Sequence, residues 1–160
     1  MKFLSDYPGG STEEVVRAFR DYSAYLRSVR ERLPKSAYEF AAAPWHYDHN
    51  DHRCPHDSWV EALTISEAAA GKRREKRHIE LAIRLLGAFH DGYLELSYSD
   101  VEAYSLVGAS DKKRVIGHDD WLADEVRLSE KNLVDHEILF RGTSRWLIEC
   151  GDINVVWTPA

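Results

Sequence analysis

Cysteine is scarce in this sequence, and long apolar runs are missing. Only two cysteines, Cys54 and Cys150, occur in 160 residues, which is too few for a disulfide framework. The first residues hold no apolar segment of the secretory type. No stretch reaches the roughly 18 consecutive apolar residues of a transmembrane helix. We therefore expect a reduced, cytoplasmic protein that does not insert into membranes.

An excess of basic residues is also absent. The chain has 27 acidic and 21 basic residues, with a formal net charge of -6. A negative surface field repels nucleic acid on average. One basic run, Lys72 to Arg77, could contact phosphate, but it lacks interleaved aromatic residues, and a solvated connection between two strands is the simpler interpretation. The charge therefore argues against nucleic acid as a partner.

The sequence does contain enough apolar residues for one core. Hydrophobic residues make up 44% of the chain and aromatic residues 11%. A chain of this length buries roughly two-thirds of its unfolded surface when it folds as one unit. We therefore expect residues 1–160 to form a single domain.

The N-terminal third, residues 1–44, is predicted to be helical. Ser11 with Glu14 three positions later forms a capping box, which marks the start of a helix that ends before Pro34. A second short helix is predicted from Ser36 to Ala43. The first helix is expected to pack on a sheet, and a short coiled coil with a partner is the alternative. Its apolar stripe consists of Val15, Phe19, Tyr22, Leu26, Val29 and Leu33.

The rest of the chain contains an internal repeat. The segment His56-Asp57-Ser58-Trp59 returns as His118-Asp119-Asp120-Trp121, and alternating apolar segments follow each copy. The third segment of each copy ends in a matching corner, Ser99-Asp100-Val101 or Gly151-Asp152-Ile153. The second copy has one extra residue, which a β-bulge would absorb. Coincidence is the alternative to a true repeat.

The repeat predicts the fold class. Residues 57–107 and 118–158 are expected to be two β-units of three to four strands each, related by an approximate two-fold rotation. The protein is then α+β, with the helices packed on a mainly antiparallel sheet or on a partly closed barrel.

Several residues have predicted roles in this fold. Trp59 and Trp121 are expected to be equivalent buried anchors, and Cys150 is expected to be a buried thiol on a core face. Asp57 and Asp119 are expected to accept backbone N–H bonds beside their tryptophans.

A His-rich loop, residues 45–57, precedes the first β-unit and holds four of the eight histidines. Imidazole and carboxylate are ligands of zinc and other divalent transition metals. The loop lacks the paired ligands of a structural zinc site, so a plain polar loop is the alternative. The candidate metal ligands are His46, His49, His52 and His56, with Asp48 or Asp57.

The His-Asp-x-Trp segments, the stretch from Leu85 to Gly92 and the two Asp corners resemble a group of uncharacterised bacterial proteins of similar size. The resemblance runs from Trp45 onward. These segments are also similar to those of small immunity proteins in bacterial polymorphic toxin systems, which neutralise a toxin by binding it. Such motifs are structural, so the resemblance implies no catalytic residue and no cofactor.

Two classes of function follow from the sequence. A non-enzymatic binding or immunity-type module with a protein partner such as a toxin is favoured by the acidic balance, the aromatic content and the lack of a nucleophile beside a plausible base. The alternative is a metal-dependent hydrolase that uses the His46 to His56 tract and a metal-bound water.

Overall fold

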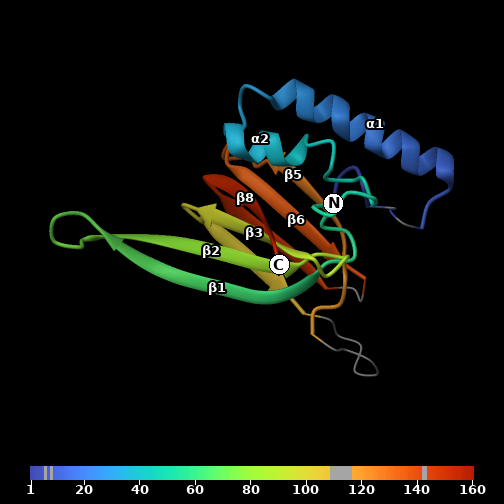
Figure 1. The fold of residues 1–160 in the computed structure, drawn as a ribbon. Helices are drawn as coiled ribbons and strands as arrows, with labels where there is room; N and C mark the ends of the chain where they lie inside the picture. Colours follow the sequence, from blue (N-terminus) through green and yellow to red (C-terminus); the bar gives the residue numbers. More distant parts are fainter. Residues whose placement is uncertain (6, 8, 109–116, 142–143) are drawn as a thin grey trace.

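The computed structural model describes residues 1–5, 7, 9–108, 117–141 and 144–160. These residues form two helices and eight strands, and the strands make two four-stranded antiparallel sheets (Figure 1). The predicted α+β class is confirmed. The partly closed barrel is wrong, because the strands form two separate sheets with the orders β1-β2-β3-β8 and β4-β7-β6-β5.

The two helices form where the sequence predicts them. Helix α1 covers Thr12–Val29 and helix α2 covers Lys35–Ala41. The capping box is present, since the Ser11 hydroxyl accepts the Glu14 N–H and the Glu14 carboxylate accepts the Ser11 N–H. Among the described residues, neither helix is long and apolar enough to cross a membrane. The helices bury Tyr22, Leu26, Val29, Ala37, Phe40 and Ala41.

The first sheet contains the strand with the clearest alternation in the sequence. Leu81, Ile83 and Leu85 of β2 are buried, as predicted. The turn after β2 contains His90, which has a positive φ of 58°. The strands of this sheet are β1 Trp59–Ala70, β2 Lys76–Leu86, β3 Gly92–Ser99 and β8 Asp152–Pro159.

Strands β1 and β2 continue beyond the rest of this sheet as a two-stranded ribbon, the β-arm (residues 66–80). β3 pairs with β2 from Leu81 to Leu86, whereas β1 and β2 stay paired as far as Ala70 and Lys76. The β-arm therefore projects from the body of the protein (Figure 1). The basic run that the sequence places in a connection lies at its tip.

The second sheet shares the cover of helix α2 with the first sheet, because α2 packs against β5 of the second sheet and against β8 of the first. All six residues of β5 from Trp121 to Val126 are buried. This strand cannot alternate between core and solvent, because side chains cover both of its faces. The strands of this sheet are β4 Ala103–Val107, β5 Trp121–Leu128, β6 Val134–Phe140 and β7 Arg145–Cys150.

The repeat is confirmed by the strand order, with an exchange that the sequence does not predict. The first three strands of each unit are neighbours, and the fourth strand of each unit joins the other sheet. Asp57 and Asp119 turn the chain into β1 and β5 with positive φ values of 61° and 66°. Both strands also contain a bulge near their start.

The two predicted corners are where the fourth strands cross to the opposite sheet. The Gly151 N–H donates to the carbonyl oxygen of Ser99 at 2.9 Å, so the two corners contact each other. A Cβ atom on residue 151 would lie only 3.1 Å from the Cβ of Asp100. Glycine therefore permits the close crossing of the two chains at this point.

One hydrophobic cluster draws side chains from both sheets and both helices. Trp121 and Cys150 are completely buried in it, as predicted. Trp59 contradicts the sequence analysis, because its side chain is 51% exposed. The buried residues of the second sheet include Val126, Val134, Ile138, Phe140, Trp146 and Ile148.

The position of the bulge explains why the two tryptophans differ. In β5 the bulge follows Trp121 at once, and Trp121 lies opposite the buried Phe140. In β1 the bulge comes one residue later, so Val60 is opposite the buried Leu85, and Trp59 is opposite Leu86 on the other face. A shift of one residue moves a side chain to the opposite face of a sheet.

Candidate functional site

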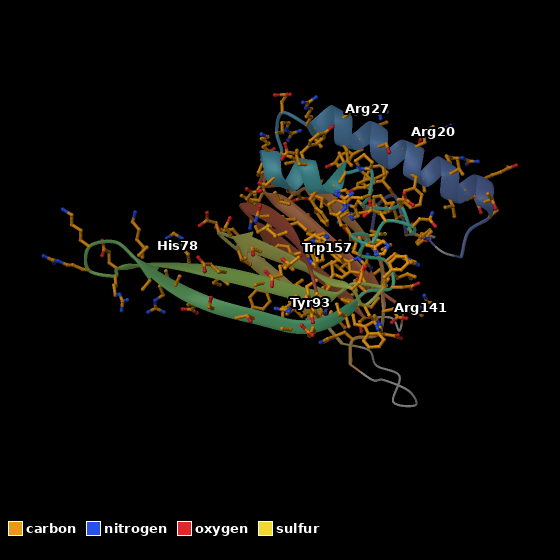
Figure 2. The ribbon with its side chains drawn as sticks, viewed as in Figure 1. Arg20, Arg27, His78, Tyr93, Arg141 and Trp157 are labelled. Carbon is orange, nitrogen blue, oxygen red and sulfur yellow. The ribbon has the colours of Figure 1, made fainter. Side chains whose placement is uncertain are left out.

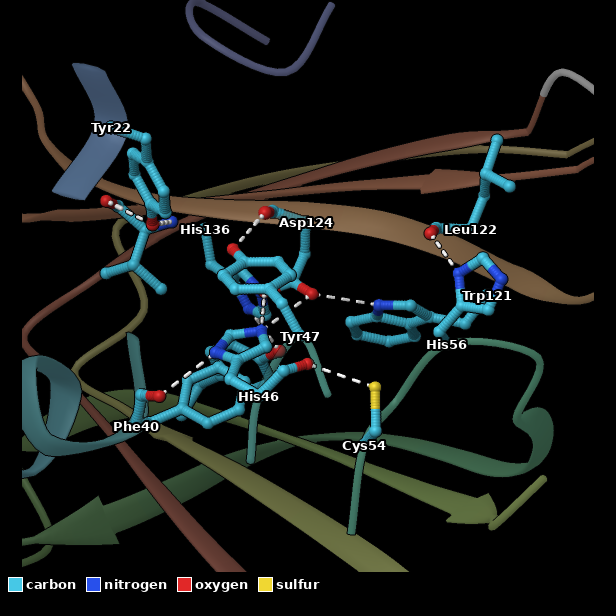
Figure 3. Close-up of polar contacts among 12 residues, drawn as sticks. Tyr22, Phe40, His46, Tyr47, Cys54, His56, Trp121, Leu122, Asp124 and His136 are labelled. Atoms are coloured by element: carbon cyan, nitrogen blue, oxygen red, sulfur yellow. Dashed lines mark hydrogen bonds and ion pairs between the residues drawn. The ribbon is translucent and has the colours of Figure 1, made fainter. Parts of the chain in front are cut away.

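Asp124 is the centre of a polar cluster inside the core (Figure 3). Its carboxylate is 1% exposed and faces three donors. His46 Nε2 lies 2.9 and 3.0 Å from the two carboxylate oxygens, and His136 Nε2 lies 3.0 Å from Oδ2. Trp121 Nε1 donates to Oδ1 at 3.0 Å. Such a carboxylate has its hydrogen-bonding capacity filled from within the protein.

His46 is held between two acceptors. Its Nδ1 lies 3.0 Å from the carbonyl oxygen of Phe40, and its Nε2 faces Asp124. Both acceptors are satisfied only when both ring nitrogens carry hydrogen, which is the imidazolium form. The ring is also stacked between Phe40 and Tyr47, with both centroid distances 4.2 Å. His46 and Asp124 therefore form a buried ion pair.

His136 links the two sheets through the same carboxylate. Its Nδ1 lies 2.8 Å from the hydroxyl oxygen of Tyr98, a residue of the first sheet. Burial raises the pKa of Tyr98 well above its usual value, so the hydroxyl keeps its proton and donates it to Nδ1. His136 Nε2–H then donates to Asp124, which fits a neutral ring.

Asp124 stays ionised in this setting. Burial alone would raise its pKa, but the adjacent His46 and His136 outweigh burial and hold the pKa below its usual value. The cluster therefore carries one carboxylate, one imidazolium and one neutral imidazole. It has no unmatched charge for a substrate to neutralise.

Space and nucleophiles are both limited at this cluster. The cavity beside His46 and Asp124 has a volume of about 10 Å³, enough for about one water molecule. Cys54 is the nearest thiol, and it donates to the carbonyl oxygen of His46 at 3.1 Å. Burial raises the pKa of Cys54 to about 11, so it is not a thiolate at neutral pH. The cluster around Asp124 therefore has a structural role and stabilises the fold.

The four candidate metal ligands are distributed over three places. His46 lies in the core on Asp124, and His52 Nδ1 lies 2.5 Å from Asp91 Oδ2 at the surface. His49 and His56 are brought together with their rings stacked 4.1 Å apart at an angle of 8°. Parallel stacked rings cannot both aim their in-plane lone pairs at one ion about 2.0 Å from each nitrogen.

The zinc site stays a prediction. Within the part of the chain that the structure describes, no three His, Cys, Asp or Glu side chains are arranged to hold a metal ion.

The two Asp residues of the repeat have different contacts. Asp119 Oδ1 accepts the N–H of Asp120 at 3.0 Å, while Asp57 Oδ1 accepts from the Arg141 guanidinium at 2.5 Å. The expected backbone bond is thus present for Asp119, and Asp57 has a side-chain partner.

The outer edge of β5 is covered by side chains from helix α1 and from the His-rich loop. β5 is an edge strand, and its outward backbone groups need partners because they are buried. Burial raises the pKa values of Tyr22 and Tyr47, so both keep the protons that they donate. The contacts join Leu122 O to His56 Nδ1 (2.8 Å), Asp124 O to Tyr47 OH (2.8 Å), Val126 O and N to Tyr22 OH (3.1 and 2.7 Å), and Leu128 N to Tyr25 OH (2.8 Å).

A second candidate site lies at the surface, where β1 begins and β2 turns into β3. We call it the aromatic surface, and it consists of His52, Trp59, Phe89 and His90. Trp59 is 51% and Phe89 49% exposed. The Trp59 ring meets His90 edge-on with centroids 4.7 Å apart, and Phe89 stacks on His52 at 4.2 Å. Such clusters of exposed aromatic residues are typical of protein-binding surfaces.

Carboxylates surround the aromatic surface. Beside Trp59 is a recess of about 440 Å³, whose lining includes Asp119 and Asp120. Two guanidinium groups offset part of this charge: Arg141 pairs with Asp57 and, through Nε at 3.3 Å, with Asp120, and Arg84 pairs with Glu61 at 2.8 Å. The remaining rim is negative and favours a cationic partner. Its exposed or partly exposed acidic residues are Asp57, Glu61, Asp91, Asp119 and Asp120.

Comparison with known proteins gives no relative: no protein-family model, curated protein or solved structure matches this chain. The likeness to immunity proteins therefore stays an expectation from the sequence.

Sequence reasoning missed the central residues of both sites. Asp124 and His136 lie on the core face of β5 and β6, opposite Ile138 and Val126. The sequence signal that could have revealed Asp124 and His136 is a polar residue at a strand position where the alternation requires an apolar one. Trp59 was assigned to the core because the sequence does not reveal where the bulge falls.

Proposed function

We propose that this chain is a non-enzymatic, protein-binding module of the bacterial cytoplasm, of the immunity type, which binds a basic protein such as a toxin through the aromatic surface. The observation that carries the proposal is the different placement of two matching tryptophans. Trp121 is fully enclosed, whereas Trp59, in the same position of the repeat, is half exposed.

The chemistry of the aromatic surface supports a binding role. Exposed Trp and Phe side chains provide large apolar contact areas, and Trp is enriched among residues that dominate binding energy. The surrounding carboxylates would steer a basic partner toward this surface and speed association. Trp59 is held at the start of β1 and Phe89 on the tight β2–β3 turn, while Asp119 and Asp120 come from the turn before β5.

The buried cluster supports a non-enzymatic function. Its best candidate for acid–base chemistry, the His46–Asp124 pair, is enclosed and has its hydrogen bonds filled by neighbouring groups. A catalytic base must come within hydrogen-bonding reach of a substrate proton. A cavity of about 10 Å³ does not admit a substrate.

Binding of a candidate basic toxin, identified among the genes beside the gene for this chain and prepared as an inactive variant, tests the proposal. Isothermal titration should show that Trp59→Ala and Phe89→Ala each weaken binding by about 30-fold or more, the loss expected for a dominant interface residue. Val156→Ala is the matched control, because Val156 is 48% exposed on β8, away from the aromatic surface.

The same titration can contradict the proposal. Wild-type affinity in a folded Trp59→Ala variant would remove the aromatic surface from the binding site. If the protein hydrolysed a substrate and this activity required His46 or Asp124, the protein would be an enzyme and the proposed binding module would be wrong.

A further inference from the structure

The β-arm differs in charge from the rest of the protein. Residues 66–80 contain five basic and three acidic side chains, a net charge of +2, so the remaining residues carry -8. Arg77 pairs with Glu67 at 3.6 Å. The other four basic side chains have no ion-pair partner among the residues that the structure describes. They are Lys72, Arg73, Arg74 and Lys76.

The β-arm also lacks a core of its own. From Ser66 to Arg77 every residue is exposed or partly exposed. A two-stranded ribbon without a packed face is marginally stable in water. At about 3.3 Å per residue, the strands carry the tip roughly 20 Å beyond the last residue that pairs with β3. A long ribbon of this kind is suited to contact another molecule.

A groove crosses the solvent face of the first sheet at the base of the β-arm. Its volume is about 330 Å³. The floor is a row of paired positions, one from each strand: Thr64, Ala82, Ser97 and Asn154. These side chains are small, so the groove can accept long side chains from outside.

The groove has acidic groups on the side nearest the β-arm. Glu80 and Asp152 line it there, and Glu80 is exposed. The Asp152 carboxylate accepts from the Ser36 hydroxyl and from the Ile153 N–H and lines the groove. The groove thus complements the tip of the β-arm in charge.

We propose that the occupant of this groove is the β-arm tip of a second copy of the chain, in a two-fold dimer with exchanged arms. The geometry favours self-association. When two β-arms lie side by side in opposite directions, each tip reaches the base of the other arm, which is where the groove lies. Arg73, Arg74 and Lys76 then meet Glu80 and Asp152 of the other copy, and the symmetry doubles each contact.

Nucleic acid is the alternative partner for a basic β-arm tip. The charge of -8 on the rest of the chain repels it, and residues 71–77 contain no aromatic side chain to stack on a base. The dimer is independent of the proposed function, because the aromatic surface lies at the end of the molecule away from the tip. Arg141, beside the aromatic surface, and His78, on the β-arm, mark the two ends in Figure 2.

Light scattering and sedimentation of the full chain at micromolar concentrations test the dimer. The wild-type protein should have twice the 18.4 kDa mass of one chain. A tip variant, Arg73→Glu with Arg74→Glu and Lys76→Glu, should be a monomer. A groove variant, Glu80→Lys with Asn154→Lys, should also be a monomer. Circular dichroism and the unfolding midpoint establish that each variant is folded.

Mixing the two variants gives the sharpest result. In the heterodimer the acidic tip of the first variant meets the basic groove of the second, and the unchanged basic tip of the second meets the unchanged acidic groove of the first. The mixture should therefore recover both exchanged contacts and form a heterodimer. The matched control is Arg17→Glu with Arg20→Glu and Arg27→Glu, the same change in charge on exposed residues of α1. Figure 2 shows Arg20 and Arg27 away from the β-arm. This control should remain a dimer.

Several results would overturn the proposal. They are a wild-type monomer throughout the concentration range, a tip variant that remains a dimer, or a mixture that stays monomeric. Fluorescence polarisation with a DNA duplex at physiological salt distinguishes nucleic acid from a second copy of the chain as the partner of the β-arm tip. If the wild-type protein binds the duplex as a monomer and the tip variant does not, the β-arm binds nucleic acid and the dimer is wrong. Trp59→Ala should leave the dimer intact.

Discussion

The Nε2 atom of His46 lies 2.9 Å from the Oδ2 atom of Asp124, and both side chains are enclosed in the core. His46 comes from the His-rich loop, and Asp124 lies 78 residues later in β5. The loop is thus tied to the second sheet by a buried ion pair. Removing one partner would leave the other charge buried without compensation.

Asp124→Asn should therefore destabilise the protein strongly. We expect a loss of about 3–5 kcal/mol in the free energy of unfolding, because the His46 imidazolium loses its counter-ion. Urea denaturation followed by circular dichroism measures this change. The control is Asp21→Asn on the exposed face of α1, which should change stability by less than about 0.5 kcal/mol. Equal midpoints for the two variants would show that the pair does not stabilise the fold.

Stability should also depend on pH through Asp124. Its pKa in the folded protein lies below the value of about 3.9 for an unfolded carboxyl. The carboxylate therefore contributes its full stabilisation above about pH 5, and the contribution falls as the pH drops through 4 and below. Below about pH 5, the stability difference between wild type and Asp124→Asn should shrink as the pH falls. A difference that grows in acid would contradict this assignment.

The two matching tryptophans should respond differently to truncation. Trp121→Ala opens a large cavity and removes a donor from Asp124, so we expect a loss of about 3–5 kcal/mol. Trp59→Ala should cost about 1 kcal/mol or less, because the side chain is half exposed. Thermal and urea unfolding of the two variants measure the contrast. Similar losses of stability in the two variants would show that Trp59 is a core residue.

The covered edge of β5 gives a further prediction. Tyr22→Phe removes the hydroxyl that pairs with both the N–H and the carbonyl of Val126. Leaving these buried backbone groups unpaired should cost about 1–3 kcal/mol. Tyr104→Phe is the control, because Tyr104 is 45% exposed on β4. If both variants unfold at the wild-type midpoint, the hydroxyl of Tyr22 is not needed to protect the edge.

Much of the fold could be predicted from local sequence patterns. The capping box at Ser11 and Glu14 marked the start of α1, and the alternation through Leu81 marked β2. Both signals are local, because they depend on hydrogen bonds and side-chain directions within a few residues. The exchange of fourth strands depends on contacts between Ser99 and Gly151, far apart in the chain, which no local pattern encodes.

The candidate site was harder to predict than the fold. The histidines of the tract share one stretch of sequence, but His46 points into the core and His52 lies at the surface. Turns in the loop separate side chains that the sequence places together. Asp124 contributes a carboxylate from another unit, and only the folded chain brings it to His46.

The central claim is that Trp59 contacts a protein partner while Trp121 does not. Fluorine NMR of 5-fluorotryptophan-labelled protein tests it most directly, since the chain has five tryptophans and single Trp→Phe variants assign their signals. When an inactive variant of the proposed toxin partner is added to saturation, the Trp59 signal should move or broaden and the Trp121 signal should stay in place. An unchanged Trp59 signal in a saturated complex would contradict the claim.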